Sequence, residues 1–219
     1  MSYLIKDEFK RAVVDGGMEL LQQGLTVGTW GNLSVKDPET GLVYIKPSGM
    51  PYTSITPQDI VVMDERGAIV DGHRKPSIEF HLHLSIMRAR SDVFAVIHTH
   101  PIYSSVFGVL REDIPAISED FAQIVGDRAS CCVYALPGTE ELAKNVVVSL
   151  GEGKAVLIPN HGTVCVGHTL DEAMKVAAVV EKTAHIYLLA RSIGTPHVLP
   201  HEDIVVMQDF MRNSYGQGK

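Results

Sequence analysis

Apolar positions along this chain follow two different periods, and their order predicts helices that alternate with strands. A period of about 3.6 residues, which is typical of amphipathic helices, covers residues 4–23, 76–89, 139–150, 170–191 and 202–211. Short apolar runs bounded by turns predict strands at residues 33–36, 42–46, 60–63, 68–70, 94–97, 132–136, 154–158 and 164–166. Residues 102–109 are apolar and fit either element. Because short turns join many of the predicted strands, we expect a mainly antiparallel sheet with helices on its faces.

Length and composition favour a single domain that spans residues 1–219. Hydrophobic residues make up 45% of the 219 positions, which is enough for one sizeable core. The net charge of −7 argues against a nucleic-acid partner and against an anionic membrane surface. No apolar run approaches the about 20 residues that span a bilayer, and the N-terminus lacks the pattern of a signal peptide. An odd number of cysteines without a CxxC motif fits reduced thiols, so we expect a soluble cytoplasmic protein.

The segment with the most chemical information is the apolar run 94–97 followed by His98-Thr99-His100-Pro101. Side chains two residues apart on a strand point to the same face, about 6.6 Å apart along the chain. Two imidazoles at this spacing can reach one metal ion. In a chain with ten histidines the pair alone is weak evidence, because solvated imidazoles at a strand end give the same pattern.

A third histidine and a carboxylate strengthen the prediction of a metal site. His161 follows another predicted strand and lies beside Gly162, which permits close approach of backbones. Glu79, near the start of a predicted helix, is the carboxylate that we select. Three imidazoles and one carboxylate suit Zn²⁺, and Co²⁺, Mn²⁺ or Fe²⁺ also accept this set.

The same helix carries a second histidine of interest. His83 lies four residues after Glu79 and therefore faces the same way, whereas His81 faces elsewhere. His83 is either an ordinary helix histidine or a hydrogen-bond partner behind the metal ligands. Spacing alone does not reveal the second role, so the ordinary interpretation is favoured.

Small polar residues in three turns are candidates for an anion-binding pocket, because loop amides and hydroxyls form concave sites for anions. Each of them is also common in plain turns. Ser77 has the strongest case, since it lies near a predicted helix N-terminus, where the helix dipole favours phosphate. The candidates are Gly31, Asn32, Ser48, Gly49 and Ser77.

Five segments together give the chain a resemblance to the class II aldolase/adducin-head family, and the similarity extends over nearly the whole length. The resemblance implies a three-layer α/β/α sandwich around a central, mainly antiparallel sheet. It also implies a fourfold homotetramer with active sites at subunit boundaries. The segments are Thr29-Trp30-Gly31-Asn32-Leu33-Ser34, Lys46-Pro47-Ser48-Gly49, Pro76-Ser77-Ile78-Glu79, His98-Thr99-His100 and Asn160-His161-Gly162.

The resemblance also implies roles for individual residues. His98, His100 and His161 match the family's zinc ligands, and Glu79 matches the acid that first ligates zinc and then acts as the base. The phosphate pocket matches Asn32, Ser48, Gly49 and Ser77. Ile78 departs from the pattern, because the family's aldolases and epimerases carry a second serine there.

Among the family's branches the pattern is most similar to L-fuculose-1-phosphate aldolase. That similarity implies reversible cleavage of a ketose 1-phosphate of the fuculose, rhamnulose or deoxyribulose type to dihydroxyacetone phosphate and an aldehyde. Glu at position 79 and the tail Ser214-Tyr215-Gly216 favour this branch, in which the tail tyrosine serves a neighbouring subunit as proton donor. The alternatives are L-ribulose-5-phosphate 4-epimerase or methylthioribulose-1-phosphate dehydratase chemistry and, with less support, a non-catalytic adducin-like domain.

One further position distinguishes the branches. Glu119 stands where the fuculose-phosphate aldolase has a catalytic tyrosine, and the epimerase and dehydratase branches use carboxylates in that region. Glu119 and Asp120 are therefore either acid/base residues or a solvated pair in a loop. Tyr215 is either the proton donor or an unordered terminal residue.

Overall fold

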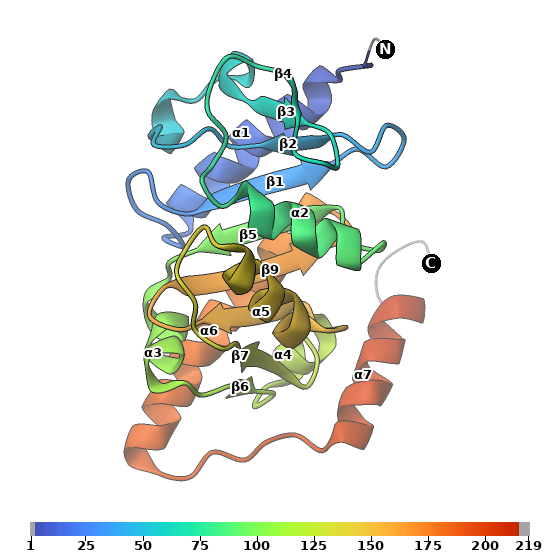
Figure 1. Cartoon of the computed structure of the whole chain (residues 1–219). Coiled ribbons are helices and arrows are strands. Elements are labelled where there is room, and N and C mark those ends of the chain that lie inside the picture. Colours follow the sequence, from blue (N-terminus) through green and yellow to red (C-terminus); the bar gives the residue numbers. More distant parts are fainter. Residues whose placement is uncertain (1–2, 215–219) are drawn as a thin grey trace.

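A computed structural model describes residues 3–214, which form a mainly antiparallel nine-stranded sheet with helices on both faces (Figure 1). The strands are β1 (Asn32–Lys36), β2 (Val43–Ile45), β3 (Val61–Met63), β4 (Ile69–Asp71), β5 (Ala95–Thr99), β6 (Ile114–Pro115), β7 (Arg128–Cys131), β8 (Ala155–Ile158) and β9 (Gly162–Gly167). Their spatial order is β4-β3-β2-β1-β5-β9-β8-β7-β6. All neighbouring strands pair antiparallel except β7 and β8, which are parallel. The predicted sheet type is confirmed.

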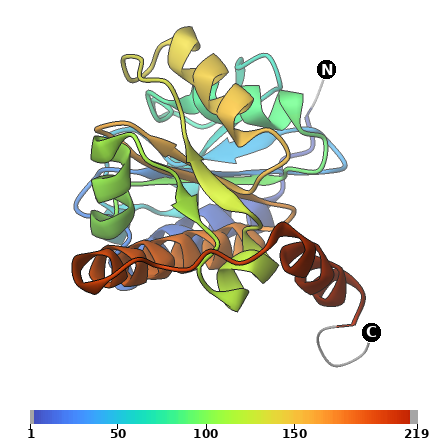
Figure 2. The ribbon, with the colours of Figure 1, turned by 90° about the horizontal axis from the view of Figure 1, so that it is seen from below.

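Helices cover the sheet on both sides, which confirms the three-layer α/β/α architecture (Figure 2). They are α1 (Asp7–Gln22), α2 (Phe80–Ala89), α3 (Ile102–Leu110), α4 (Glu119–Ile124), α5 (Glu140–Leu150), α6 (Leu170–Ile193) and α7 (His201–Asn213), with the 3-10 turns η1 (Tyr52–Ser54) and η2 (Pro57–Asp59). One face packs against α2 and α5. The opposite face packs against α1, α3, α4 and α6, and α7 packs on α4. None of these helices combines the length and the apolar composition that crossing a bilayer requires.

Strand β5 shows how the sequence pattern creates two cores. Successive side chains on a strand point to opposite faces, so Val96 lies in the core beneath α2 and α5, while Ala95 and Ile97 lie in the core beneath α1 and α6. All three are fully buried. Because both faces are covered, the strand is continuously apolar up to His98, where the polar site begins.

One predicted element differs from the structure, and one segment whose type was left open is resolved. The strand predicted over residues 132–136 is wrong: the strand in this region is β7, which ends at Cys131, and Val133 and Leu136 are 71% and 65% exposed. The amide of Cys132 still donates to Leu157 of β8, but β8 ends at Ile158, so the residues that follow have no strand to pair with and form a loop. The apolar segment that fitted either element is helix α3, whose N-terminal amides of Tyr103 and Ser104 donate to the Glu181 carboxylate.

Candidate metal centre

The two histidines of the His98-Thr99-His100 segment lie at the end of the central strand β5. His98 is fully buried, and its Nε2 lies 3.0 Å from Nε2 of His100. β5 is hydrogen-bonded on one side to β1 and on the other to β9, so its end is held in register by two neighbours. The strand therefore delivers both rings to one place, as their spacing predicts.

His161 joins this pair from the turn between β8 and β9. Its Nε2 lies 3.3 Å from Nε2 of His98, and the three rings have centroids 4.7–5.0 Å apart. Asn160 adopts a left-handed conformation (φ 54°), which turns the chain sharply before β9. Gly162 is needed because a Cβ there would lie 2.2 Å from the carbonyl oxygen of Thr99.

Replacing this glycine is expected to damage both the fold and the site. In Gly162→Ala the added methyl would also meet the His100 ring at 2.8 Å, so β9 must move away from β5. We expect a loss of about 1–3 kcal/mol of unfolding free energy, which is typical of overpacking, together with a lower metal content. Denaturant titration measures the loss, and Gly194→Ala is the control. An added Cβ at Gly194 would meet no described atom within 4 Å, so its unfolding free energy should change by no more than about 0.5 kcal/mol.

Glu79 provides the carboxylate that completes the cluster. It is buried at the N-cap of α2, where its Oε2 lies 3.3 Å from Nε2 of His98 and its Oε1 lies 3.5 Å from Nε2 of His161. Asn32 Nδ2 donates to Oε2 at 3.0 Å. Oε1 is buried and has no hydrogen-bond partner among residues 3–214, which is costly for an ionised oxygen unless a cation satisfies it.

The protonation of the rings also suits a cation. His98 Nδ1 donates to the carbonyl oxygen of Thr163 at 3.1 Å, which leaves the lone pair of Nε2 facing the cluster. Burial is the largest cause that lowers the pKa of His98, His100 and His161, so the rings are neutral near pH 7. Neutral imidazole is the form that binds metal.

Four distances between donor atoms are close to those around a tetrahedral ion. Two atoms at about 2.05 Å from Zn²⁺, separated by a tetrahedral angle, lie about 3.3 Å apart. Nε2 of His98 lies 3.0 Å from Nε2 of His100 and 3.3 Å from Nε2 of His161. The Glu79 carboxylate oxygens lie 3.3 Å from Nε2 of His98 and 3.5 Å from Nε2 of His161. The described residues therefore place three ring nitrogens where a divalent ion fits, with the Glu79 carboxylate next to two of them.

A cavity of about 380 Å³ opens beside this cluster and contains all five predicted anion-binding residues. The structure thus brings together turns that are far apart in the sequence. Gly49 has φ 67° and an open space where a Cβ would lie, and Ser77 Oγ accepts a hydrogen bond from the backbone of Glu79 at 3.3 Å. The lining residues are Thr29, Trp30, Gly31, Asn32, Lys46, Pro47, Ser48, Gly49, Ser77, Ile78, Glu79, His100, Pro137 and His161.

Lys46 lines the cavity, and sequence reasoning missed it as a functional residue. Its side chain is 2% exposed, and Nζ donates to the carbonyl oxygens of Thr29 at 3.2 Å and Pro47 at 3.3 Å. Within residues 3–214 no carboxylate forms an ion pair with it, and burial lowers its pKa to about 8. A lysine at the end of an apolar strand, directly before Pro47-Ser48-Gly49, was the signal available in the sequence.

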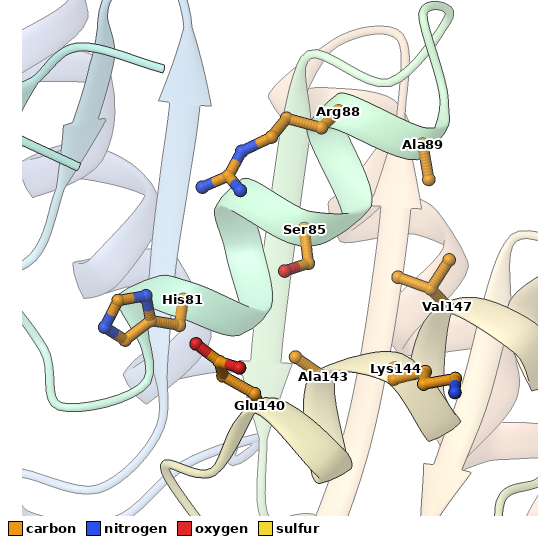
Figure 3. A pocket seen from close by; sticks show the side chains of 8 residues that line it. All are labelled: His81, Ser85, Arg88, Ala89, Glu140, Ala143, Lys144 and Val147. Carbon is orange, nitrogen blue, oxygen red and sulfur yellow. The ribbon is translucent and has the colours of Figure 1, made fainter. Parts of the chain in front are cut away.

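His83 does not behave as the ordinary helix histidine that was favoured. It is fully buried and hydrogen-bonded to the Asn32 side chain, which in turn is hydrogen-bonded to the Glu79 carboxylate. His81 faces elsewhere, as predicted, and lines a groove of about 570 Å³ between α2 and α5, where Glu140 lies opposite it (Figure 3). That groove is separate from the cavity beside the histidines, with which it shares no lining residue.

Glu119 does not line this cavity in a single chain. It is the exposed first residue of α4, which packs against α6 and α7. Asp120 forms an ion pair with Lys182 and accepts from Ser118, which fits a structural role. Tyr215 lies outside the described residues.

Comparisons with known proteins agree with this geometry. Residues 11–188 match the family model for the Class II Aldolase and Adducin N-terminal domain. The chain is 35% identical to 5-deoxy-D-ribulose 1-phosphate aldolase of Bacillus thuringiensis serovar kurstaki, over 96% of this chain and 97% of that protein. It is 34% identical to L-fuculose phosphate aldolase of Escherichia coli, with the same coverage of both chains.

A solved structure of an L-fuculose 1-phosphate aldolase is also similar, with a TM-score of 0.93 and 38% identity over 97% of this chain and 100% of that chain. Similarity of this extent covers the helices, the sheet and the cavity together. The chain is therefore a member of the class II aldolase/adducin family.

Proposed function

We propose that the protein is a divalent-metal-dependent aldolase that cleaves a ketose 1-phosphate to dihydroxyacetone phosphate and an aldehyde. The observation that carries the proposal is the convergence of His98, His100, His161 and Glu79 beside a cavity lined by small polar loops. Relatives at about 35% identity are aldolases for 5-deoxyribulose 1-phosphate and fuculose phosphate, so substrates of the fuculose, rhamnulose and deoxyribulose type are proposed.

Each part of the site has a role in the proposed reaction. A bound Zn²⁺, or Co²⁺, Mn²⁺ or Fe²⁺, would supply a Lewis acid that stabilises the negative charge left when the C3–C4 bond breaks. In cleavage the C4 hydroxyl loses its proton as the C4 aldehyde forms, and the bonding electrons pass into the C2–C3 enediolate. Glu79, which takes up a proton from solvent when substrate binds, then gives it to C3, which yields dihydroxyacetone phosphate, and the proton of the C4 hydroxyl leaves to solvent. In condensation Glu79 removes that proton from C3.

The group that accepts and returns the C4 hydroxyl proton is proposed to come from a neighbouring subunit. The family resemblance assigns this role to Tyr215, and Glu119 is the second candidate. Glu119 lies away from the cavity of its own chain, so it would act in another subunit's site. We therefore propose a homotetramer with sites at subunit boundaries.

The cavity next to Glu79 suits a phosphate group. Lys46 supplies a buried cation that has no carboxylate partner in the part of the chain that the structure describes, and Ser48, Gly49 and Ser77 supply hydroxyls and turn amides. These groups bind the anion locally, against the overall negative charge of the chain. Ile78 is 70% exposed and offers no hydroxyl, so backbone amides and the remaining hydroxyls would serve in place of the serine that the family pattern places there.

Removing the cation is expected to weaken substrate binding more than turnover. In Lys46→Met we expect KM for a ketose 1-phosphate to rise about 10- to 100-fold, because a hydrogen bond to a charged group contributes about 1.5–3 kcal/mol. The charge of Lys46 is present below its pKa of about 8 and is lost above it. The wild-type KM should therefore rise as pH increases beyond about 8, and this rise should be absent in the variant.

Steady-state kinetics across pH check this prediction. Lys144→Met is the matched control, because that lysine lies in the groove between α2 and α5 (Figure 3) and should leave KM unchanged. An unaltered KM in Lys46→Met would remove Lys46 from the phosphate site.

The function itself is tested by incubating metal-loaded protein with a panel of ketose 1-phosphates. We expect dihydroxyacetone phosphate to appear in a coupled reduction by NADH. Inversion at C4 of a pentulose 5-phosphate, or loss of water without cleavage, would instead support the epimerase or the dehydratase. Purified protein that neither binds metal nor turns over any of these sugars would support a non-catalytic domain.

A further inference from the structure

A line of buried hydrogen bonds connects β1 and α2 to the carboxylate of Glu79. Ser34 Oγ lies 2.7 Å from His83 Nδ1, and His83 Nε2 lies 2.5 Å from Asn32 Oδ1. Asn32 Nδ2 then donates to Glu79 Oε2 at 3.0 Å. Ser34 and His83 are 0% exposed, Asn32 is 4% exposed and Glu79 is 7% exposed, so bulk solvent does not compete for these bonds.

The direction of every bond in this line follows from the chemistry of its members. A carboxylate only accepts, so the Asn32 amide must present its NH₂ end to Glu79 and its oxygen to His83. The His83 proton therefore lies on Nε2, and Nδ1 accepts from the hydroxyl of Ser34. Burial lowers the pKa of His83 to about 3, which leaves one ring proton for this purpose.

The spacing of the residues explains why one ring serves both neighbours. Asn32 and Ser34 are two residues apart on β1 and point to the same face, about 6.6 Å apart along the strand. Glu79 and His83 are one helical turn apart on α2. The strand step and the helical turn are of similar length, so the two pairs interlock, with His83 bridging both strand residues.

We propose that His83 is a positioning residue for Glu79. Its Nε2–H holds the Asn32 amide in the orientation that presents a donor to the carboxylate, and this keeps Glu79 directed at the rings of His98 and His161. His83 is absent from the cavity lining, so it acts only through Asn32. This inference rests on the proposed function and deepens it.

Loss of the His83 donor would have a specific consequence. The buried Oδ1 of Asn32 would be without its partner, and the amide would be free to turn over. Turning over places Oδ1 against Oε2 of Glu79, and two acceptors in contact repel each other. The carboxylate would then leave the position in which it lies 3.3 Å from His98 Nε2.

Two substitutions of His83 distinguish the effect of the hydrogen-bond donor to Asn32 from the effect of a polar side chain at this position. The amide nitrogen of glutamine lies three bonds from Cβ, as Nε2 of histidine does, so His83→Gln keeps the donor to Asn32. The amide of asparagine lies two bonds from Cβ, as Nδ1 does, so His83→Asn reaches only towards Ser34. Both variants place an uncharged amide in the same buried space.

Two measurements compare these variants with the wild type: kcat and the absorption spectrum of the Co²⁺-loaded protein. We expect His83→Asn to lower kcat for ketose 1-phosphate cleavage about 10- to 100-fold, as loss of a ligand's hydrogen-bond partner does, with a smaller change in KM. His83→Gln should stay within about 3-fold of the wild type. The visible absorption of Co²⁺-loaded protein, which depends on ligand number and geometry, should shift in His83→Asn towards that of Glu79→Gln and remain unshifted in His83→Gln.

Ser34→Ala is the second test if either variant at position 83 fails to fold. It keeps the ring and removes only the bond that fixes the proton on Nε2, so we expect a smaller loss of kcat and a Co²⁺ shift in the same direction. Equal losses in both His83 variants with a wild-type Co²⁺ spectrum would overturn the proposal, as would wild-type kcat in His83→Asn. The Co²⁺ spectra test the inference even if no ketose phosphate is cleaved, so its failure is distinguishable from failure of the proposed function.

Discussion

The Glu79→Gln variant is expected to retain its metal and to cleave ketose 1-phosphates about 10²- to 10⁴-fold more slowly than the wild type, which is the usual contribution of a general acid–base. The amide of glutamine has nearly the shape of the carboxylate but neither takes nor returns a proton. His98, His100 and His161 remain to hold the ion. The measurement is kcat from the release of dihydroxyacetone phosphate, with metal content determined on the same preparation.

The control for this variant is Glu141→Gln, which changes an exposed carboxylate on α5 by the same chemistry. It should leave both kcat and metal content unaltered. Full activity of Glu79→Gln would remove Glu79 from the mechanism and would leave its burial beside three imidazoles without a catalytic explanation.

The His161→Ala variant is expected to lose its metal and, with it, cleavage. His161 comes from the turn between β8 and β9, so its removal takes one of the four donor groups and leaves the strand pairing intact. Loss of a hydrogen-bond partner behind a metal ligand lowers metal affinity about 10- to 100-fold. Loss of a ligand itself should lower the affinity by more than that. Competition with a chelator measures the affinity, and the same samples give the activity.

His197→Ala is the matched control, because His197 is exposed in the segment between α6 and α7. Metal affinity in that variant should equal that of the wild type. If His161→Ala binds metal as tightly as the wild type does, the ion lies elsewhere or the coordination set differs from the one described.

Alternation along a strand was enough to predict the pair His98 and His100, because residues two apart on β5 share a face whatever the rest of the fold does. His161 was predictable from a different pattern. A polar residue beside a glycine at the end of an apolar run indicates the point where the chain leaves the core. Glu79 needed more, since its place at the N-cap of α2 depends on how that helix lies over the sheet.

Other features depended on tertiary packing that no local pattern contains. Residues 132–136 have strand composition, yet β8, the strand that pairs with β7, ends at Ile158, so they form a loop. The role of His83 follows from Ser34 and Asn32, which lie about fifty positions earlier in the chain. Lys46 becomes notable only once its burial is known, together with the lack of an ion-pair partner among the described residues. Glu119 belongs to a helix that no periodicity predicted, and one chain does not bring it to the cavity.

Titration of chelator-treated protein with Zn²⁺ tests most directly whether three imidazoles and Glu79 form one metal centre. We expect saturable binding of a single ion per chain, followed by the return of ketose 1-phosphate cleavage in proportion to the ion bound. Absence of saturable binding, or cleavage that persists at full rate in the metal-free protein, would contradict it.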